Sequence, residues 1–259
     1  MIKLESHNPS WSKKFQLEAQ SLKNILGNNC LELHHIGSTS IPKIYAKPII
    51  DILIVVNDLA KVDLCNINMT KLGYIVKGEY GFFMRRFFIK ENAFHVHIFE
   101  KGNSEIDRHL KFRDWMRTHT RDRLAYESLK KNLAKKYQND ITAYSIAKTD
   151  FVTHIEEKAG WDGIKICKAF TELEWDKVAQ YHSKYDLNIE YKSLKNDSSN
   201  THFLLFKREL IIGYAYLQMR NGKISINILE VDKKYQYSSV EEYFRASIQR
   251  WLNLKELKD

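Results

Sequence analysis

A Gly-Ser pair between two strand-like segments constrains the fold of this chain more than any other feature. The surrounding sequence is HHIGSTSIPKIYAKPIIDILIVV, residues 34–56, and its β-branched end is typical of a strand covered on both faces. Gly37 has no side chain to keep a phosphate from the backbone N–H groups, and Ser38 adds a hydroxyl donor. Asp51 lies on the following strand, where a rigid carboxylate can hold Mg²⁺ against the same phosphate. A turn glycine beside a buried, hydrogen-bonded aspartate is the structural alternative.

The segments around this motif predict an α+β protein. Apolar residues recur at helical spacing over residues 11–26, and Gly27 ends that helix. Another helix is predicted within residues 58–72, and the signal from 105 to about 158 is helical in three runs. Between them, alternating segments predict a sheet meander over 73–80, 82–90 and 93–100.

A second series of elements begins after the glycines at 160 and 163. It reads as a strand from Ile164, a helix over 171–185, three strands near 202–207, 210–219 and 224–231, and a helix over about 239–252. We therefore predict two domains, 1–160 and 161–259, with the boundary near Trp161.

The balance of charged residues favours anionic partners. Lys and Arg number 41 against 32 Asp and Glu, and the resulting net charge of +9 suits nucleotides, RNA or coenzyme phosphates. A solvated basic surface is the alternative, and one helix is predicted to turn Lys130, Lys131, Lys135 and Lys136 to water. No apolar stretch reaches the roughly 20 residues of a membrane span, so we expect a cytoplasmic protein without membrane contact.

A series of short motifs continues in order along the first part of the chain. They are Gly37-Ser38-Thr39, Pro42, Ala46-Lys47-Pro48, Ile49-Ile50-Asp51-Ile52, Leu72-Gly73-Tyr74, Arg85-Arg86, His95-Val96-His97, His109-Leu110, Phe112-Arg113-Asp114, Tyr126, Leu129-Lys130, and Tyr144 through Lys148 to Phe151. Over about residues 1–158 this pattern resembles the GrpB or UPF0157 family, which is grouped with the polymerase-beta-type nucleotidyltransferase fold. The resemblance implies a mixed sheet with helices, and nucleotidyl transfer from a nucleoside triphosphate to a small-molecule, RNA or protein acceptor.

The resemblance also implies which residues form the site. Gly37-Ser38-Thr39 would contact the nucleotide phosphates, with Lys47 or Arg85 balancing their charge. Asp51 is the implied catalytic residue and ligand of a divalent Mg or Mn ion. Lys47 has an alternative role, in which it pairs with Asp51 and stabilises the loop.

One position departs from the pattern of active nucleotidyltransferases, which carry two carboxylates one residue apart. Leu53 occupies the second position, and strand alternation puts residues 51 and 53 on one face. The third carboxylate is expected on AFHVHIFE, where His95 and His97 share a face and Glu100 follows. A site of Asp51, His95 and His97 favours a transition metal such as Zn²⁺ over Mg²⁺. Hydrogen-bonded structural histidines are the alternative.

Two pairs of charged residues receive structural interpretations. Arg85 and Arg86 lie on one predicted strand, so one is expected to point into the site and the other to lie at the surface. Arg113 and Asp114 are interpreted as an ion pair between helices rather than as a catalytic dyad.

The C-terminal series carries a second resemblance. The segments Ile211–Ala215 and Ile228–Asp232 are similar to parts of a GNAT acetyltransferase, over about residues 163–259, and the later strands of that family are missing. The following loop, KKYQYSS, has no glycine, whereas backbone N–H groups of a glycine-rich loop hold a coenzyme pyrophosphate. We expect a truncated GNAT-like domain that does not use acetyl-CoA, and its open sheet edge favours a homodimer.

Three functions are consistent with these features. The first is a metal-dependent nucleotidyltransferase with a degenerate acetyltransferase-like domain. The second is a non-catalytic protein that binds a nucleotide, coenzyme A or RNA, which Leu53 and the glycine-free loop favour. The third is an acyl-CoA-dependent N-acetyltransferase. The residues alone do not decide between an enzyme and a binding protein.

Overall fold

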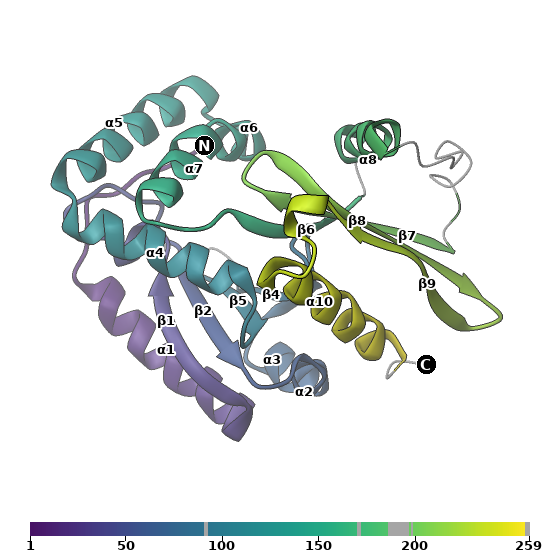
Figure 1. Cartoon of the computed structure of the whole chain (residues 1–259). Coiled ribbons are helices and arrows are strands. Elements are labelled where there is room, and N and C mark those ends of the chain that lie inside the picture. The colour runs from purple at the N-terminus through teal and green to yellow at the C-terminus, as the bar shows by residue number, and fades with distance from the viewer. Residues whose placement is uncertain (91–92, 170–171, 186–196, 198, 257–259) are drawn as a thin grey trace. The chain divides into compact units, whose positions relative to one another are not determined.

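The computed structural model describes the whole chain except residues 91–92, 170–171, 186–196, 198 and 257–259. The chain divides into two compact units, each with one sheet (Figure 1). Unit 1 comprises Met1–Tyr80 and Met84–Trp161, and unit 2 comprises Gly81–Phe83 and Asp162–Asp259. The predicted α+β class is confirmed, because both units combine strands with helices.

Five strands form the sheet of unit 1, in the order β1-β2-β5-β4-β3. β2 runs parallel to β5, and the other neighbouring strands are antiparallel. The predicted meander is confirmed as β3, β4 and β5. The parallel pair places the strand of Asp51 beside the strand of the two histidines. The strands are β1 Cys30–Ile36, β2 Ile50–Val56, β3 Ile75–Gly78, β4 Arg85–Lys90 and β5 Phe94–Glu100.

Helices cover both faces of this sheet, as the apolar sequence of β2 predicts. On one face, Leu53 is fully buried in a cluster with Ile36 and Phe99, against which Ile106 and Leu110 of helix α4 pack. On the other face, helix α1 packs against β1 and β2. Asp51 belongs to the α4 face, because side chains two residues apart on a strand share a face.

Three helices of unit 1 begin at side chains that cap them. Asp58, Asn103 and Asp140 accept hydrogen bonds from backbone N–H groups in the first turns of α2, α4 and α6. Two predicted helices are each divided, at Cys65 and between Ile146 and Thr149. The helices are α1 Ser10–Leu26, α2 Leu59–Leu64, α3 Asn66–Lys71, α4 Ser104–Thr118, α5 Thr120–Tyr137, α6 Ile141–Ile146 and α7 Thr149–Lys158.

Unit 2 contains an antiparallel sheet in the order β6-β7-β8-β9. Trp175, Val178 and Tyr181 of helix α8 form a core cluster with residues of β7 and β8, including Tyr214. Trp251 of helix α10 packs against Phe203 of β7 at a ring separation of 5.1 Å. The elements are β6 Ile164–Lys168, α8 Glu172–Tyr185, β7 Asn200–Lys207, β8 Leu210–Arg220, β9 Lys223–Val231 and α10 Ser239–Glu256.

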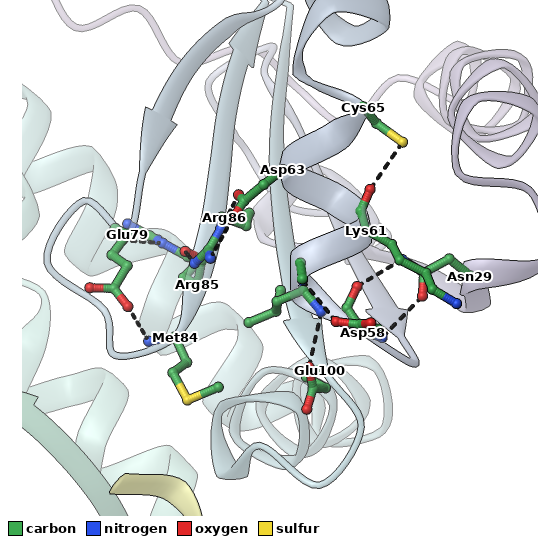
Figure 2. Close-up of polar contacts among 12 residues, drawn as sticks. Asn29, Asp58, Lys61, Asp63, Cys65, Glu79, Met84, Arg85, Arg86 and Glu100 are labelled. Atoms are coloured by element: carbon green, nitrogen blue, oxygen red, sulfur yellow. Dashed lines mark hydrogen bonds and ion pairs between the residues drawn. The ribbon is translucent and has the colours of Figure 1, made fainter. Parts of the chain in front are cut away.

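Two expectations about charged residues are wrong. Arg86 does not lie at the surface: it is 6% exposed, and its Nε and Nη2 donate to the Asp63 carboxylate on α2 at 2.5 and 2.9 Å (Figure 2). This two-point ion pair is what allows the guanidinium to be buried. Arg113 and Asp114 do not join two helices, because both lie on α4 and bond to each other at 2.7 Å.

Two general properties of the chain follow from the described residues. No helix among them is both long enough and apolar enough to cross a bilayer. Cys30, Cys65 and Cys167 are free thiols and are half-buried.

Candidate functional site

The Gly-Ser turn lies directly against the Asp51 carboxylate. β1 ends at Ile36, which is the register partner of Asp51 on β2. The next residue, Gly37, has φ +66°, and a Cβ atom there would lie 2.1 Å from Oδ2 of Asp51. Only glycine tolerates both this backbone conformation and this approach. The glycine therefore serves to admit a carboxylate from its own chain.

Hydrogen bonds hold the residues after Gly37 in a tight turn. The Ser40 hydroxyl donates to the Gly37 carbonyl at 2.7 Å, and the Thr39 hydroxyl donates to the Ile49 carbonyl at 3.1 Å. His35 Nε2 lies 3.0 Å from the same Thr39 hydroxyl, and burial lowers the pKa of His35 to about 4. Thr39 is 2% exposed, so its hydroxyl joins the turn to β2 and does not face a ligand.

Two histidines of β5 converge on the Asp51 carboxylate. In the parallel register Asp51 is the partner of His95, and His97 lies two residues further on. His95 Nδ1 is 3.4 Å and His97 Nε2 is 3.8 Å from Oδ1 of Asp51. Burial raises the pKa of this carboxyl, but the two nearby histidines outweigh burial and hold the pKa below its usual range. Asp51 is therefore ionised in the folded protein.

Arg85 fixes how His97 is protonated. Its Nη1 lies 3.2 Å from His97 Nδ1, and its Nη2 donates to the Tyr80 carbonyl. Its Nε donates to the Glu79 carbonyl (Figure 2). A guanidinium can only donate, so His97 Nδ1 accepts, and the neutral ring carries its proton on Nε2, toward Asp51. Burial lowers the pKa of His97, in agreement with a neutral ring.

Of Asp51, His95 and His97, only the first two could act as ligands of a metal ion in this arrangement. With its proton on Nε2, His97 has no lone pair to give to a cation near Asp51. Within the described residues, no three or more His, Cys, Asp or Glu side chains form a group that could hold a metal ion. Asp51 and His95 retain donor atoms toward the same space. Glu100 is turned elsewhere, since its Oε2 accepts from the Leu59 N–H at the start of α2 (Figure 2).

A cavity of about 690 Å³ opens beside Asp51 in unit 1. Of the predicted site residues, Ser38, Lys47, Asp51 and His95 line it. The other predicted site residues are not among those that line the cavity. They are Gly37, Thr39, Arg85 and His97, and their contacts described above support the lining residues. The remaining lining is Met1, Ile2, Lys3, Pro48, Ile49, Ile75, Ile89, Lys130, Ile141, Tyr144, Ser145 and Lys148.

Two lysines of this cavity flank a single aromatic ring. Lys47 Nζ lies 4.6 Å and Lys148 Nζ lies 4.4 Å from the centre of the Tyr144 ring. Burial lowers the pKa of both amines, that of Lys148 to about 8, with the charge of Lys47 adding to the shift. Both groups would recover a higher pKa beside an anion. The pair is therefore suited to a phosphate-bearing ligand.

Lys130 is the residue whose position differs most from expectation. The prediction that it faces water is wrong, because its side chain is 2% exposed. Its Nζ donates to the Tyr45 carbonyl at 2.6 Å and lies 4.6 Å from the centre of the Tyr126 ring. Burial, with the charge of Lys148, lowers the pKa of Lys130 to about 7.

A sequence signal for the burial of Lys130 exists in its spacing. Lys130 follows Tyr126 by four residues, and both lie on α5. Residues four apart share one face of a helix, and Tyr126 is buried. A lysine at that spacing is placed inside with the ring.

The second carboxylate of an active nucleotidyltransferase has no equivalent here. Leu53 stands at its position and is fully buried with Ile36 and Phe99. A charge at that position would have to be buried among apolar side chains, which is strongly unfavourable. Among the described residues that line the cavity there are thus one carboxylate, Asp51, and four lysines, Lys3, Lys47, Lys130 and Lys148.

Comparisons with known proteins agree on the first 158 residues. A sequence model of the GrpB protein family matches residues 1–158. The chain is 40% identical over 160 residues to UPF0157 protein BH1888 of Halalkalibacterium halodurans, covering 61% of this chain and 82% of that protein. It is 40% identical over 161 residues to UPF0157 protein YqkA of Bacillus subtilis, covering 61% of this chain and 47% of that protein.

A solved structure is similar over the same extent. The crystal structure of the conserved protein GrpB from Enterococcus faecalis is 41% identical in sequence and superposes with a TM-score of 0.59, covering 61% of this chain and 96% of that one. The family match ends before unit 2 resumes at Asp162 and includes every residue of the cavity described above. Through residues 1–158, the chain belongs to the GrpB protein family.

Proposed function

We propose that the cavity of unit 1 binds a nucleoside triphosphate and supports transfer of its nucleotidyl group. The observation that carries this proposal is the presence of Lys47, Lys130 and Lys148 in one cavity with Asp51. A volume of about 690 Å³ lies within the range of small-molecule sites. With Lys3, four lysines and one carboxylate line the described cavity, and this excess of amines favours a ligand with several negative charges.

The lysines, Ser38 and Asp51 have different roles in this cavity. The lysines bind the phosphates, and the Ser38 hydroxyl donates a further hydrogen bond. Asp51 would hold Mg²⁺ or Mn²⁺ together with phosphate oxygens, because Mg²⁺ is usually bound through one or two carboxylates and substrate phosphates. That cation would neutralise charge that develops on the phosphates during transfer. A Zn²⁺ site would draw on Asp51 and His95 alone, since Arg85 orients the His97 proton toward Asp51.

A second candidate function is nucleotide binding without transfer. The burial of Leu53 favours it, because a two-metal mechanism depends on carboxylates at both positions. In this case Asp51 and the lysines select the ligand, and no bond is broken.

For unit 2 we propose a binding role rather than acetyl transfer. The loop after β9 contains η3, Lys233–Tyr235, and offers no glycine for the approach of a coenzyme pyrophosphate. β9 lies at an edge of the described sheet, where a second copy of the chain could add a strand. The proposed partner of unit 2 is a second copy of the chain, which would form a homodimer through β9. The alternative partner is an RNA or coenzyme A bound to basic side chains.

Thermal denaturation of the full chain tests nucleotide binding. ATP, GTP, CTP and UTP are each added with Mg²⁺, Mn²⁺ or Zn²⁺ to wild type, Asp51→Asn and Lys148→Met. A nucleotide at 100 times its Kd stabilises the fold by about 2.7 kcal/mol. We expect a shift in wild type that Lys148→Met weakens and that depends on the cation only when Asp51 is present. Lys136→Met, a change on an exposed side chain, is the matched control.

The same samples separate transfer from binding. Release of pyrophosphate with a bound nucleotide supports transfer. A thermal shift without pyrophosphate release in the presence of candidate acceptors supports the binding protein. No shift with any nucleotide overturns both functions.

A further inference from the structure

We propose that Ile75 and Ile89 form an apolar subsite that holds the nucleobase of the bound nucleoside triphosphate. This inference rests on the proposed function, because the nucleotide must first occupy the cavity of unit 1. It gives the nucleotide one orientation across the sheet, with its base over β3 and β4 and its phosphates beside β2. It also assigns part of the binding energy to side chains that carry no charge.

Four residues that line the cavity form one row across the sheet. Asp51 on β2 is the register partner of His95 on β5, His95 is the partner of Ile89 on β4, and Ile89 is the partner of Ile75 on β3. Side chains of residues directly opposite each other lie on the same face of a sheet. All four line the cavity, so the row forms one of its walls. The row spans three strand spacings of about 4.8 Å each, which is about 14 Å in all.

The polarity of this wall changes from one end of the row to the other. At the β2 end, Asp51 lies near Lys47 and Lys148: burial lowers the pKa of both amines, and the Asp51 charge acts against that shift in both. At the β3 end, the side chains of Ile89 and Ile75 offer only hydrocarbon. A phosphate there would lose its hydration without gaining a partner. The phosphates therefore belong at the lysine end, which leaves the uncharged base for the isoleucines.

The isoleucines leave apolar surface open to a ligand. Ile75 is 53% exposed on β3, an edge strand of the described sheet, and Ile89 beside it is half-buried. Ile141 of α6, which is 62% exposed, lines the same cavity. Small-molecule sites are lined mainly by apolar side chains, with a few polar groups that fix the orientation of the ligand. A flat base laid on Ile75 and Ile89 would remove their apolar surface from water, which favours binding.

His95 occupies the middle of the row, one strand from Asp51 and one strand from Ile89. Its side chain is 31% exposed, its Nδ1 is 3.4 Å from the Asp51 carboxylate, and its ring packs edge-on against Phe87 at a ring separation of 5.6 Å. The sugar and the α-phosphate connect the base of a nucleotide to its terminal phosphates. In the proposed orientation, these two groups lie over the His95 ring.

The test is isothermal titration of the full chain with ATP and with inorganic tripolyphosphate, each in the presence of Mg²⁺. Tripolyphosphate has the phosphates of ATP without its base and sugar, so the comparison isolates the nucleoside part. We expect Ile75→Ser to raise the Kd of ATP about fivefold to tenfold and to change the Kd of tripolyphosphate by less than about twofold. Lys148→Met should weaken the binding of both ligands.

Val76→Ser is the matched control for Ile75→Ser. Val76 is the next residue on β3 and is 38% exposed, but it is the register partner of Phe88, so its side chain lies on the opposite face of the sheet. It is not among the described residues that line the cavity. We expect Val76→Ser to leave the Kd of both ligands unchanged. Because both side chains are exposed, both variants should unfold near the wild-type Tm in the absence of ligand.

The outcomes separate this inference from the proposed function. ATP binding that Ile75→Ser does not weaken overturns the inference and leaves the proposed function in place. Equal weakening of ATP and tripolyphosphate by Ile75→Ser also overturns the inference, because the side chain would then not act through the base. The same holds if Val76→Ser weakens ATP as much as Ile75→Ser does. Absence of ATP binding to wild type overturns both proposals.

A measurement on wild type covers the case in which Ile75→Ser does not fold. Burial of apolar surface on binding gives a negative change in heat capacity. Titrations of wild type at several temperatures give this change for each ligand. We expect a more negative value for ATP than for tripolyphosphate, because only ATP has a base that covers the isoleucines. Equal values for the two ligands overturn the inference.

Discussion

Gly37 and Asp51 approach so closely that a Cβ atom on residue 37 would lie 2.1 Å from Oδ2 of the carboxylate. The two residues are adjacent across the β1–β2 pair, where Ile36 is the partner of Asp51. Because Asp51 is also fixed by the histidines of β5, it has little room to move away from an added methyl group. The glycine thus determines where Asp51 lies, the one carboxylate among the described residues that line the cavity.

Gly37→Ala should therefore lower the free energy of unfolding by more than the strain of a positive φ alone would. A left-handed backbone with a Cβ atom costs about 1–2 kcal/mol, and the contact with Asp51 adds to it. Gly78→Ala is the matched control, because its φ of +63° is similar to the +66° of Gly37 and nothing lies within 4 Å of its added Cβ. Urea denaturation of both variants measures the difference. Equal losses of unfolding free energy would show that Asp51 moves aside freely.

Arg86→Met should strongly destabilise unit 1. The change leaves the Asp63 carboxylate without its two-point partner on β4, and breaking a buried ion pair in this way costs about 3–5 kcal/mol. Urea denaturation gives the loss. The double variant Arg86→Met with Asp63→Leu should recover part of it, since no charge is then left unpaired by the change. A loss below about 1 kcal/mol for Arg86→Met contradicts the assigned role of the pair.

Lys130 should make the stability of the fold depend on pH in the alkaline range. Its pKa is about 7 when folded and about 10.4 in an unfolded chain. Between these values the unfolded state binds more protons, so stability rises with pH, and this gain is lost as the pH falls through 7. Relative to Lys130→Met, wild type should gain up to about 1.4 kcal/mol per pH unit between pH 7.5 and 9.5.

Urea denaturation of wild type and Lys130→Met at these two pH values gives the difference directly. Lys131→Met controls for the loss of one positive charge from the same helix. A gap between wild type and Lys130→Met that is the same at both pH values contradicts the shifted amine.

The His182 side chain should lower the stability of unit 2, and it should lower that stability further at acidic pH. It is 4% exposed, and neither ring nitrogen has a hydrogen-bond partner among the described residues. Burial lowers its pKa, so the unfolded state binds more protons below about pH 6.5 and stability is lost as the pH falls. His182→Phe should keep the edge contact with the Tyr214 ring and stabilise unit 2 by about 1–3 kcal/mol at pH 7.

Hydrogen exchange of peptides from β7 and β8 measures this local stability. We expect slower exchange in His182→Phe at pH 7 and a larger difference at pH 5.5, after correction for the intrinsic rate. His154→Phe, at an exposed position of α7, is the control and should leave these peptides unchanged. Faster exchange in His182→Phe at either pH contradicts the prediction.

Most of the helices and strands, and the central motif, can be predicted from the order of the residues. Strand alternation placed Asp51, His95 and His97 on compatible faces, and periodicity gave α1, the meander and α10, because these patterns depend on local geometry alone. The family resemblance over residues 1–158 was likewise visible in ordered motifs and is matched by the family comparison. Such features need only the spacing of residues along the chain.

Which charged side chains are buried depends on contacts that form when the chain folds. The sequence assigns Lys130 and one residue of the pair Arg85 and Arg86 to water, but all three are buried. Lys130 and Arg86 are buried because distant groups meet them, the Tyr45 carbonyl and the Asp63 carboxylate. The proton on His97 was decided in the same way, by Arg85 from the neighbouring strand. Burial of a charge depends on partners far away in the sequence, so no local pattern fixes it, and the cavity that those partners form exists only in the folded chain.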